Sequence, residues 1–383
     1  MSERGHGMNG NEPIVIAQII GKWLGGGVES VVMNYYRHID RDKVQFDFLC
    51  DEDSVAIPFD EIKALGGKVT LIPPYQSVFR YHRQVKKILR EGQYAIVHSH
   101  INTLSVFPLF AATCAGVPVR IAHSHSTTSP QEFKRNVAKL LLRPFAKLFA
   151  THYFACTEHA GRWLFGNRAF DKGRVTVMNN AIDLDRFKPN EAARAAKRRE
   201  LGIGDGTLVL GHVGRFATVK NHDFLVDVFA NVHAQNPDSV LLLVGQGPLE
   251  DEIKKKVARL GLADAVIFAG QRDDVDEYYR AMDVFLLPSL YEGLGMVLIE
   301  AQASGCRALA SENVPAVAKA TELLEFVPLA NGAAAWAAAV LKNADAGQSG
   351  GNPDALRERY DIRTQAQLLE ARYTELYRTA VKR

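Results

Sequence analysis

Cysteine is scarce in this 383-residue chain, and its four cysteines lie far apart. No CxxC pair occurs among Cys50, Cys114, Cys156 and Cys306, so we expect neither a zinc knuckle nor a disulfide framework. Reduced thiols are typical of the cytoplasm. Uncharged apolar runs fall short of the roughly 20 residues of a membrane-spanning helix, and residues 1–12 lack an apolar signal-peptide core. We therefore expect a cytoplasmic protein.

An excess of charge of one sign is also absent. The chain has 46 Lys and Arg against 43 Asp and Glu, which gives a net charge of +3. This is too small to indicate a nucleic-acid partner. The glycines at 25–27 follow an expected strand but lack GxGxxG spacing, so a nicotinamide dinucleotide is a poor candidate ligand.

Strand-like apolar runs alternate with helical patterns along the chain, which predicts an α/β protein with parallel sheets. The expected strands of the first half are 13–20, 44–49, 68–72, 94–98, 119–123, 152–156 and 175–178. Those of the second half are 207–213, 240–244, 266–269, 284–287, 307–310 and 324–327. The charged stretch 191–206 has no strand signal and is expected to be a linker with a short helix. The length suits two domains on either side of it.

A strand, a polar loop and a helix follow one another over residues 284–300. The apolar run stops at Pro288, and a loop with Glu292 and two glycines precedes a helical pattern that carries Glu300. Backbone N–H groups at 293–296 should then lie at the carboxyl end of a strand, where anions and hydroxyls bind well. Amides between two carboxylates suit a nucleotide sugar, with phosphate on the amides, ribose on one acid and sugar on the other.

A second loop, residues 214–221, follows the expected strand 207–213. It starts with Gly214 and carries the cations Arg215 and Lys220. The planar fork of arginine and the point charge of lysine together match a diphosphate. Taken alone, this loop is slightly better explained by a pair of solvated surface charges that cap the next helix. Together with the loop of Glu292, it is better explained as a diphosphate-binding loop.

In this order and at this separation, the two loops resemble those of the retaining glycosyltransferases of family four, which have the GT-B fold. The similarity runs from about Ile14 to the C-terminus and is strongest over 211–311. It implies two Rossmann-like domains that face each other across a cleft. Residues 1–190 would bind the acceptor, with the terminal helix 364–383 packed back on them, and residues 207–363 would bind the nucleotide sugar.

The resemblance also implies residue roles. Arg215 and Lys220 would bind the diphosphate, and Glu292 would bind the donor sugar. A histidine at the end of strand 119–123 would face that sugar; the motif leaves His123 or His125 open, and we favour His125. The donor-binding residues would be Gly26, Gly27, Gly214, Asn221, Gly293, Leu294, Gly295, Met296 and Glu300, with His123 and Asn180 in the cleft.

The implied reaction transfers a hexose or N-acetylhexosamine from a nucleoside diphosphate sugar, with UDP favoured, to a glycan or lipid-linked acceptor. The anomeric configuration would be retained, and the pathway would make bacterial surface polysaccharide. No metal or other cofactor is expected, because cations and helix amides would stabilise the leaving diphosphate. The alternatives are a sugar-nucleotide epimerase of the same fold and a noncatalytic sugar-nucleotide-binding protein.

Three further features stay open. The basic amphipathic stretch 131–150 suits either an ordinary domain helix or a peripheral contact with an anionic membrane. Two His-Ser-His sequences, 98–100 and 123–125, could suggest a metal site, but no nearby acid completes a ligand set. Arg307 stands where the family usually carries proline, and its role is undetermined.

Overall fold

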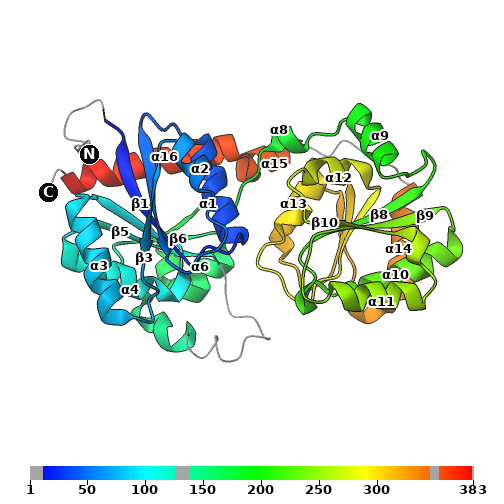
Figure 1. Cartoon of the computed structure of the whole chain (residues 1–383), viewed down its shortest axis with the longest axis horizontal. Coiled ribbons are helices and arrows are strands. Elements are labelled where there is room, and N and C mark those ends of the chain that lie inside the picture. The colour runs from blue at the N-terminus through cyan, green and yellow to red at the C-terminus, as the bar shows by residue number, and fades with distance from the viewer. Residues whose placement is uncertain (1–11, 126–138, 346–352, 382–383) are drawn as a thin grey trace. The chain divides into compact units, whose positions relative to one another are not determined.

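The computed structural model describes residues 12–125, 139–345 and 353–381 (Figure 1). The chain divides into two compact units, the first formed by 1–181 with 362–383 and the second by 182–361. Each unit contains one sheet, whose described strands all pair in parallel. The boundary lies after Ala181, not near residue 190.

The sheet of the first unit has seven strands in the order β3-β2-β1-β4-β5-β6-β7. Side chains from alternate positions enter different cores, as the two-residue period of a strand requires. Ile16 and Phe48 belong to one core, whereas Ala17 and Leu49 belong to the other. The strands are β1 Ile14–Gly21, β2 Val44–Asp51, β3 Lys68–Ile72, β4 Ile96–Ser99, β5 Val119–Ser124, β6 His152–Ala155 and β7 Val175–Val177.

Helices cover both faces of this sheet (Figure 1). They include α16 (Ile362–Val381), which buries Ile362, Ala366, Leu369 and Tyr373 in the core of Ile16. This helical spacing of apolar residues explains why the end of the chain belongs to the first unit. The others are α1 Gly27–His38, α2 Phe59–Ala64, α3 Val78–Glu91, η1 Asn102–Ser105, α4 Val106–Ala115, η2 Arg143–Lys147, α6 Glu158–Phe165 and α7 Asn167–Asp171.

The sheet of the second unit has six strands in the order β10-β9-β8-β11-β12-β13. The order in which strands are added reverses at β8 and β11: β9 and β10 lie on one side of β8, and β12 and β13 lie on the far side of β11. Ligands of such sheets bind outside the carboxyl ends of the strands at this point. The strands are β8 Leu208–Val213, β9 Ser239–Val244, β10 Val266–Gly270, β11 Val284–Leu287, β12 Arg307–Ala310 and β13 Leu324–Phe326. The main helices are α8 Leu184–Phe187, α9 Glu191–Glu200, α10 His222–Gln235, α11 Glu250–Arg259, α12 Val275–Ala281, α13 Met296–Ala303, α14 Gly332–Asp345 and α15 Pro353–Tyr360.

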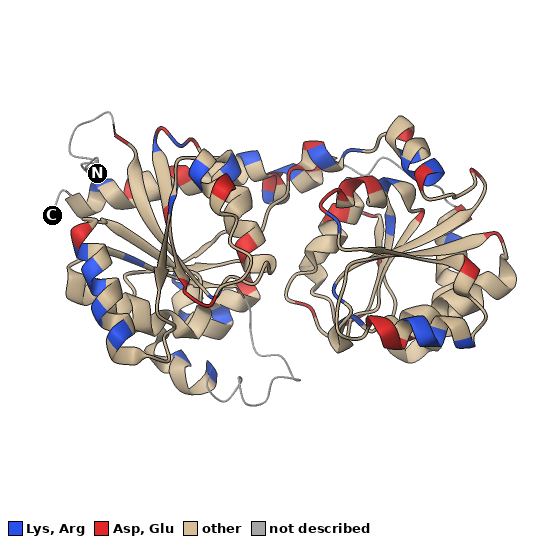
Figure 2. Cartoon of the chain, in the orientation of Figure 1, with Lys and Arg blue, Asp and Glu red and all other residues tan. Residues whose placement is uncertain are grey.

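The stretch expected as a linker belongs to the second unit. Its helix α9 packs beside α12, and Figure 2 shows the basic and acidic residues of these helices. Lys197 Nζ lies within 3.1 Å of carboxylate oxygens of Asp274 and Glu277, and Arg194 Nη2 lies 2.5 Å from Asp283 Oδ1. The charged residues that suggested a linker therefore form ion pairs that hold α9 against α12 and the residues beside it.

The basic stretch 131–150 is described only from residue 139 onward. Residues 139–142 are helical, and the chain then tightens into the 3₁₀ turn η2. Pro144 explains the change, because proline lacks the N–H that a continuing α-helix needs. The long helix expected to reach residue 150 therefore ends earlier.

Candidate active site

The two loops that carry the sequence motifs meet in the second unit. The loop after β8 places Lys220 Nζ 2.6 Å from Glu292 Oε1, on the loop after β11. Both side chains are largely buried, with 18% and 12% of their surface exposed. The Asn221 amide donates to Pro288 O at 3.2 Å, and Leu290 N–H donates to Val219 O at 2.8 Å. These bonds hold the two loops together at the carboxyl ends of neighbouring strands.

Glu292 is held by a hydroxyl as well as by the lysine. Ser289 Oγ donates to the same Oε1 at 2.8 Å, and Ser311 Oγ in turn donates to Ser289 O at 2.5 Å. The Ser289 bond locks the carboxylate in one position before any ligand arrives.

The helix α13 begins directly after this carboxylate. Gly295 is its N-cap, with a φ of +78° that favours glycine. Leu294 is 6% exposed and packs in the core, so it can offer a ligand only its backbone. Gly293 is exposed. The first N–H groups of α13 have no intrahelical acceptor, which suits an anion.

Glu300 lies one turn into α13 and is held by a buried tyrosine. Tyr279 O–H donates to Glu300 Oε2 at 2.8 Å. Burial raises the pKa of Glu300, while the Tyr279 bond and the charges of Arg186 and Lys220 oppose this shift. The carboxylate is thus fixed as an acceptor for a ligand hydroxyl.

Two glycines after β9 allow close approach to the loop of the cations. A Cβ on Gly245 would lie 2.2 Å from Gly214 O, and one on Gly247 would lie 2.4 Å from Phe216 O. Phe216 N–H donates to Gln246 O at 3.1 Å. Glycine is therefore needed at positions 245 and 247, because the backbone of the loop that carries Arg215 passes too close for a side chain. Arg215, on the same loop, is exposed.

Arg307 lies at the other end of the sheet from these loops. It is the first residue of β12 and pairs with Val284, the first residue of β11. The candidate site follows the last residue of β11, Leu287. The replacement of proline by Arg307 therefore does not add a cation to the site within this unit.

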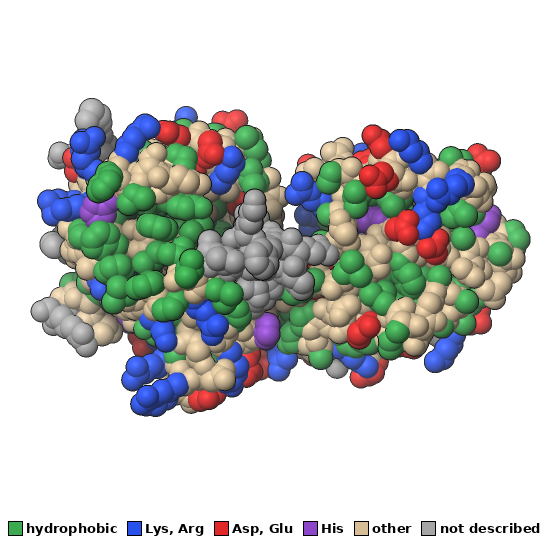
Figure 3. All heavy atoms as spheres, turned by 90° about the horizontal axis from the view of Figure 1, so that it is seen from below, with side chains coloured by type: hydrophobic (Ala, Val, Ile, Leu, Met, Phe, Trp, Pro, Cys, Tyr) green, Lys and Arg blue, Asp and Glu red, His purple; other side chains and the backbone are tan. Residues whose placement is uncertain are grey.

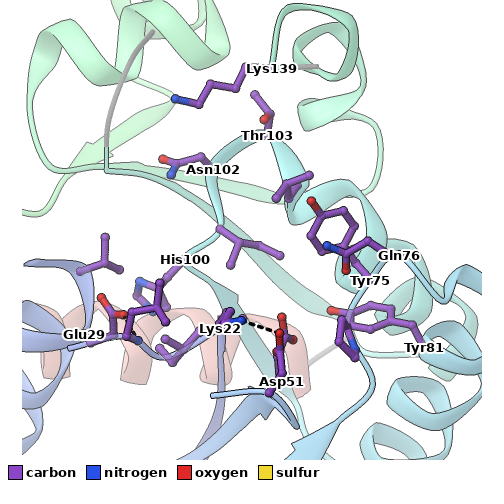
Figure 4. A pocket seen from close by; sticks show the side chains of 18 residues that line it. Lys22, Glu29, Asp51, Tyr75, Gln76, Tyr81, His100, Asn102, Thr103 and Lys139 are labelled. Carbon is purple, nitrogen blue, oxygen red and sulfur yellow. Dashed lines mark hydrogen bonds and ion pairs between the residues drawn. The ribbon is translucent and has the colours of Figure 1, made fainter. Parts of the chain in front are cut away.

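A cavity of about 530 Å³ opens in the first unit, at the carboxyl ends of β1 to β4 (Figure 4). Three carboxylates and two lysines line it. Lys22 Nζ pairs with Asp53 Oδ2 at 2.6 Å, and burial together with the charge of Asp53 raises the pKa of Asp51 to about 6. The lining includes Lys22, Glu29, Asp51, Asp53, His100 and Lys139.

Most residues of this cavity did not stand out in the sequence. Asp51, Asp53 and Asn102 each follow or end a strand expected from apolar runs, and strand ends of one parallel sheet share an edge. The position of these residues at strand ends was therefore the feature of the sequence that could have predicted the cavity. His100 also lines the cavity.

The predicted glycine loop lies beside this cavity. Gly26 is the N-cap of α1, and Gly27 is its first residue. Glu29 accepts a bond from Leu24 N–H at 3.0 Å, which closes the loop. Asn180 lies near the end of the first unit, and its Oδ1 is buried without a partner among the described residues.

His123 and His125 differ in position although they are two residues apart. His123 is fully buried within β5, whereas His125 follows the strand end. His125 N–H donates to Asn102 Oδ1 at 2.7 Å, and Asn102 lines the cavity. Of the two, His125 is therefore the better placed to reach a ligand.

Comparisons with known proteins identify the family. The model of Glycosyltransferase Family 4 matches residues 25–186, and that of Glycosyl transferases group 1 matches residues 193–342. The chain is 37% identical to EpsF of Bacillus subtilis (strain 168) over 329 residues, which cover 84% of this chain and 86% of EpsF. This chain belongs to glycosyltransferase family 4. The two α/β units are those of the GT-B fold.

Further relatives of this family 4 glycosyltransferase are more distant. It is 26% identical to the UDP-Gal:α-D-GlcNAc-diphosphoundecaprenol α-1,3-galactosyltransferase of Escherichia coli, over 74% of this chain and 76% of that protein. The solved structure of Anabaena HepE with UDP-glucose matches with a TM-score of 0.77 at 20% identity, over 94% of this chain and 99% of HepE. WaaG, a glycosyltransferase of lipopolysaccharide biosynthesis, matches with a TM-score of 0.65 at 17% identity, over 96% of this chain and 98% of WaaG.

Proposed function

We propose that this protein transfers a hexose from a UDP-sugar to a lipid-linked glycan acceptor, with retention of configuration and without a metal ion. The contact that carries the proposal is the Lys220–Glu292 pair at the start of α13. A diphosphate on the helix amides would compete with Glu292 for the lysine. The released carboxylate would then be free to accept sugar hydroxyls, so that one event prepares both halves of the donor site.

The second acid fits the remaining part of the donor. Glu300 is oriented by Tyr279 and lies one turn into α13, eight residues after Glu292, so that the first amides of the helix stand between the two acids in the chain. A ribose between them would place its hydroxyls within reach of Glu300. Charge on the leaving diphosphate would be stabilised by Lys220, Arg215 and the helix N-terminus. HepE was solved in complex with UDP-glucose, and the E. coli relative is named for UDP-Gal; both favour uridine as the base.

The cavity of the first unit is the proposed acceptor site. Its volume of about 530 Å³ lies within the range of small-molecule sites. Glu29 and Asp51 offer acceptors for sugar hydroxyls, and Lys22 and Lys139 offer cations for a diphosphate linkage. A sugar on a polyprenyl diphosphate has both kinds of group.

Calorimetric titration of UDP tests the donor half. Loss of a charged hydrogen bond costs about 1.5–3 kcal/mol, so Lys220→Met should weaken UDP binding about tenfold to a hundredfold. Lys254→Met is the matched control, because Lys254 also pairs with a glutamate of the second unit, Glu250, at 2.7 Å. Equal affinity for UDP in both variants would contradict the assignment of the site.

Product analysis tests the reaction. Incubation with UDP-glucose or UDP-galactose and a polyprenyl diphosphate-linked N-acetylhexosamine should add one hexose to the acceptor mass. Proton NMR of the new glycosidic bond should show the α configuration of the donor. EDTA should leave the rate unchanged. A β-linked product, an epimerised donor or a requirement for a divalent cation would each reject the corresponding part of the proposal.

We propose further that the protein contacts an anionic membrane through the first unit. None of the described helices combines the length and apolar content needed to cross a bilayer. Leu140, Leu141, Phe145 and Leu148 are 51–68% exposed, although they are large apolar side chains. Figure 3 shows hydrophobic side chains gathered on the first unit with lysines and arginines beside them. Apolar contact combined with basic charge is what binding to anionic lipid requires.

The neighbouring helix α3 extends this surface. The ring of His82, on α3, stacks on the ring of Phe110 of α4. Phe110 in turn contacts the ring of Phe149, which follows η2. The exposed cations of α3 are Arg80, Arg83, Lys87 and Arg90. Vesicle flotation should show binding that rises with phosphatidylglycerol content and is lost in Leu141→Ser/Phe145→Ser. Leu260→Ser, an exposed leucine of the second unit, is the control.

A further inference from the structure

Six polar side chains form a connected network inside the first unit. Four are the histidines of the two His-Ser-His sequences, which end β4 and β5. The fifth lies on β1 and the sixth on α16, 355 residues apart in the chain. All but one are at most 3% exposed. The members are Gln18, His98, His100, His123, His125 and Tyr373.

One half of the network runs from the end of β5 to Gln18. His125 Nε2 lies 2.9 Å from His100 Nδ1, and His100 Nε2 lies 2.8 Å from Gln18 Oε1. An amide oxygen can only accept, and a neutral imidazole has one donor and one acceptor nitrogen. His100 therefore carries its proton on Nε2, and its Nδ1 accepts from His125 Nε2–H.

The other half runs from Gln18 through the C-terminal helix back to β5. Gln18 Nε2 donates to the Tyr373 hydroxyl at 3.2 Å, and that hydroxyl lies 2.6 Å from His98 Nδ1. Of these two partners only His98 Nδ1 can accept the hydroxyl proton, because the amide N–H only donates, so Tyr373 donates to His98. The opposite nitrogen of His98, Nε2, then donates to His123 Nδ1 at 3.0 Å. All four imidazoles are thereby assigned the Nε2–H tautomer.

Burial supports the neutral state that this assignment requires. It lowers the pKa of all four histidines, that of His125 to about 3 and those of the others well below the ordinary value. Repulsion between the rings adds to the shift for His98, His100 and His123.

A bound metal ion is the other explanation for clustered histidines. Nitrogens of His98, His100 and His123 lie within 4.8 Å of one another. An ion would need a free lone pair from each ring. Both nitrogens of His98 and His100 are already engaged in the network, so binding would break it. Of the ring nitrogens of these three histidines, His123 Nε2 alone has no partner among the described residues, and in this assignment it carries a proton and has no lone pair for an ion.

We propose that Gln18 and Tyr373 are positioning residues that hold His125 as the Nε2–H tautomer, with Nδ1 as an acceptor for a hydroxyl of the bound sugar. The asymmetric amide of Gln18 sets the direction of every bond in the network. The helix α16 thereby acts on the end of β5 through Tyr373. Only the sugar contact rests on the proposed function; the tautomer does not.

Histidine NMR of the full chain tests the tautomers without any ligand. Long-range ¹H–¹⁵N correlation of ¹⁵N-histidine protein at pH 7, assigned through single His→Gln variants, should show Nε2–H for all four rings. In Tyr373→Phe the amide of Gln18 loses its acceptor and can rotate. The excess of the Nε2–H form of His125 should then fall about fivefold, the factor that one hydrogen bond supplies.

Tyr36→Phe is the matched control. Tyr36 is a fully buried tyrosine of the same core, and its hydroxyl also bonds a glutamine, Gln45, at 2.5 Å. It should leave the signals of His125 unchanged. If Tyr373→Phe does not fold, Gln18→Met removes the same link. An Nδ1–H form of His125 in the wild type, or equal spectra in wild type and Tyr373→Phe, would overturn the proposal.

Kinetics separates the tautomer from its use. If the NMR result holds, Tyr373→Phe should raise the KM for the UDP-sugar or lower kcat at least fivefold relative to Tyr36→Phe. Equal kinetics in the two variants would reject the role of His125 toward the sugar. Absence of any transferase activity would reject the proposed function and leave the NMR result standing.

Discussion

Mild acid should destabilise the first unit, because its histidine network must stay neutral. His98, His100, His123 and His125 all have lowered pKa values in the fold. Unfolded histidines titrate near pH 6.5. Between pH 6 and 5 the unfolded chain therefore binds about four protons that the fold excludes, and stability is lost as the pH falls.

One carboxylate opposes this trend. Asp51 has a pKa raised to about 6, so it binds its proton in the fold before it does so in the unfolded chain. For these five groups the net difference is about three protons, which corresponds to a loss of roughly 4 kcal/mol per pH unit; the lowered pKa of His152 acts in the same direction as those of the four histidines. Domains are stable by about 5–15 kcal/mol, so this slope should remove a substantial part of the stability of the first unit between pH 6 and 5.

Urea unfolding at several pH values measures this slope. In a Trp336→Phe background, fluorescence reports only Trp23 and Trp163, both in the first unit. Replacement of His123 by Gln should reduce the slope, whereas replacement of His159, which is exposed, should not. A free energy of unfolding that is constant or rises from pH 6.5 to 5 would refute the reasoning.

Two further predictions concern the second unit. Gly245→Ala should cost at least about 3 kcal/mol in urea unfolding, because its Cβ would meet Gly214 O at 2.2 Å with a φ of +133°. Gly261→Ala, with a φ of +69° but open space, should cost only about 1 kcal/mol, and equal losses would disprove the steric argument. Tyr279→Phe should raise the pKa of Glu300 further, so that the loss of UDP binding on acidification, measured by calorimetry, begins about one pH unit higher. An unchanged pH profile would count against a role for Glu300 in binding.

The element types could be predicted from local sequence. Apolar runs such as 284–287 and 307–310 became strands with those same limits, since strands of a parallel sheet are buried on both faces. The family followed from two short loops, because a glycine, two cations and two acids occur at characteristic separations. The strand order, by contrast, depends on contacts that local patterns do not encode.

Long-range contacts decided the sites. Lys220 and Glu292 are 72 residues apart, and only the sheet brings them within 2.6 Å. Charge alone made 191–206 resemble a linker, whereas its partners on α12 show that it is an interface. A partner for His98 could not be inferred locally, since Tyr373 stands 275 residues away. Sequence by itself therefore determined the element types and the family, and tertiary structure decided which polar groups neutralise, orient and connect one another.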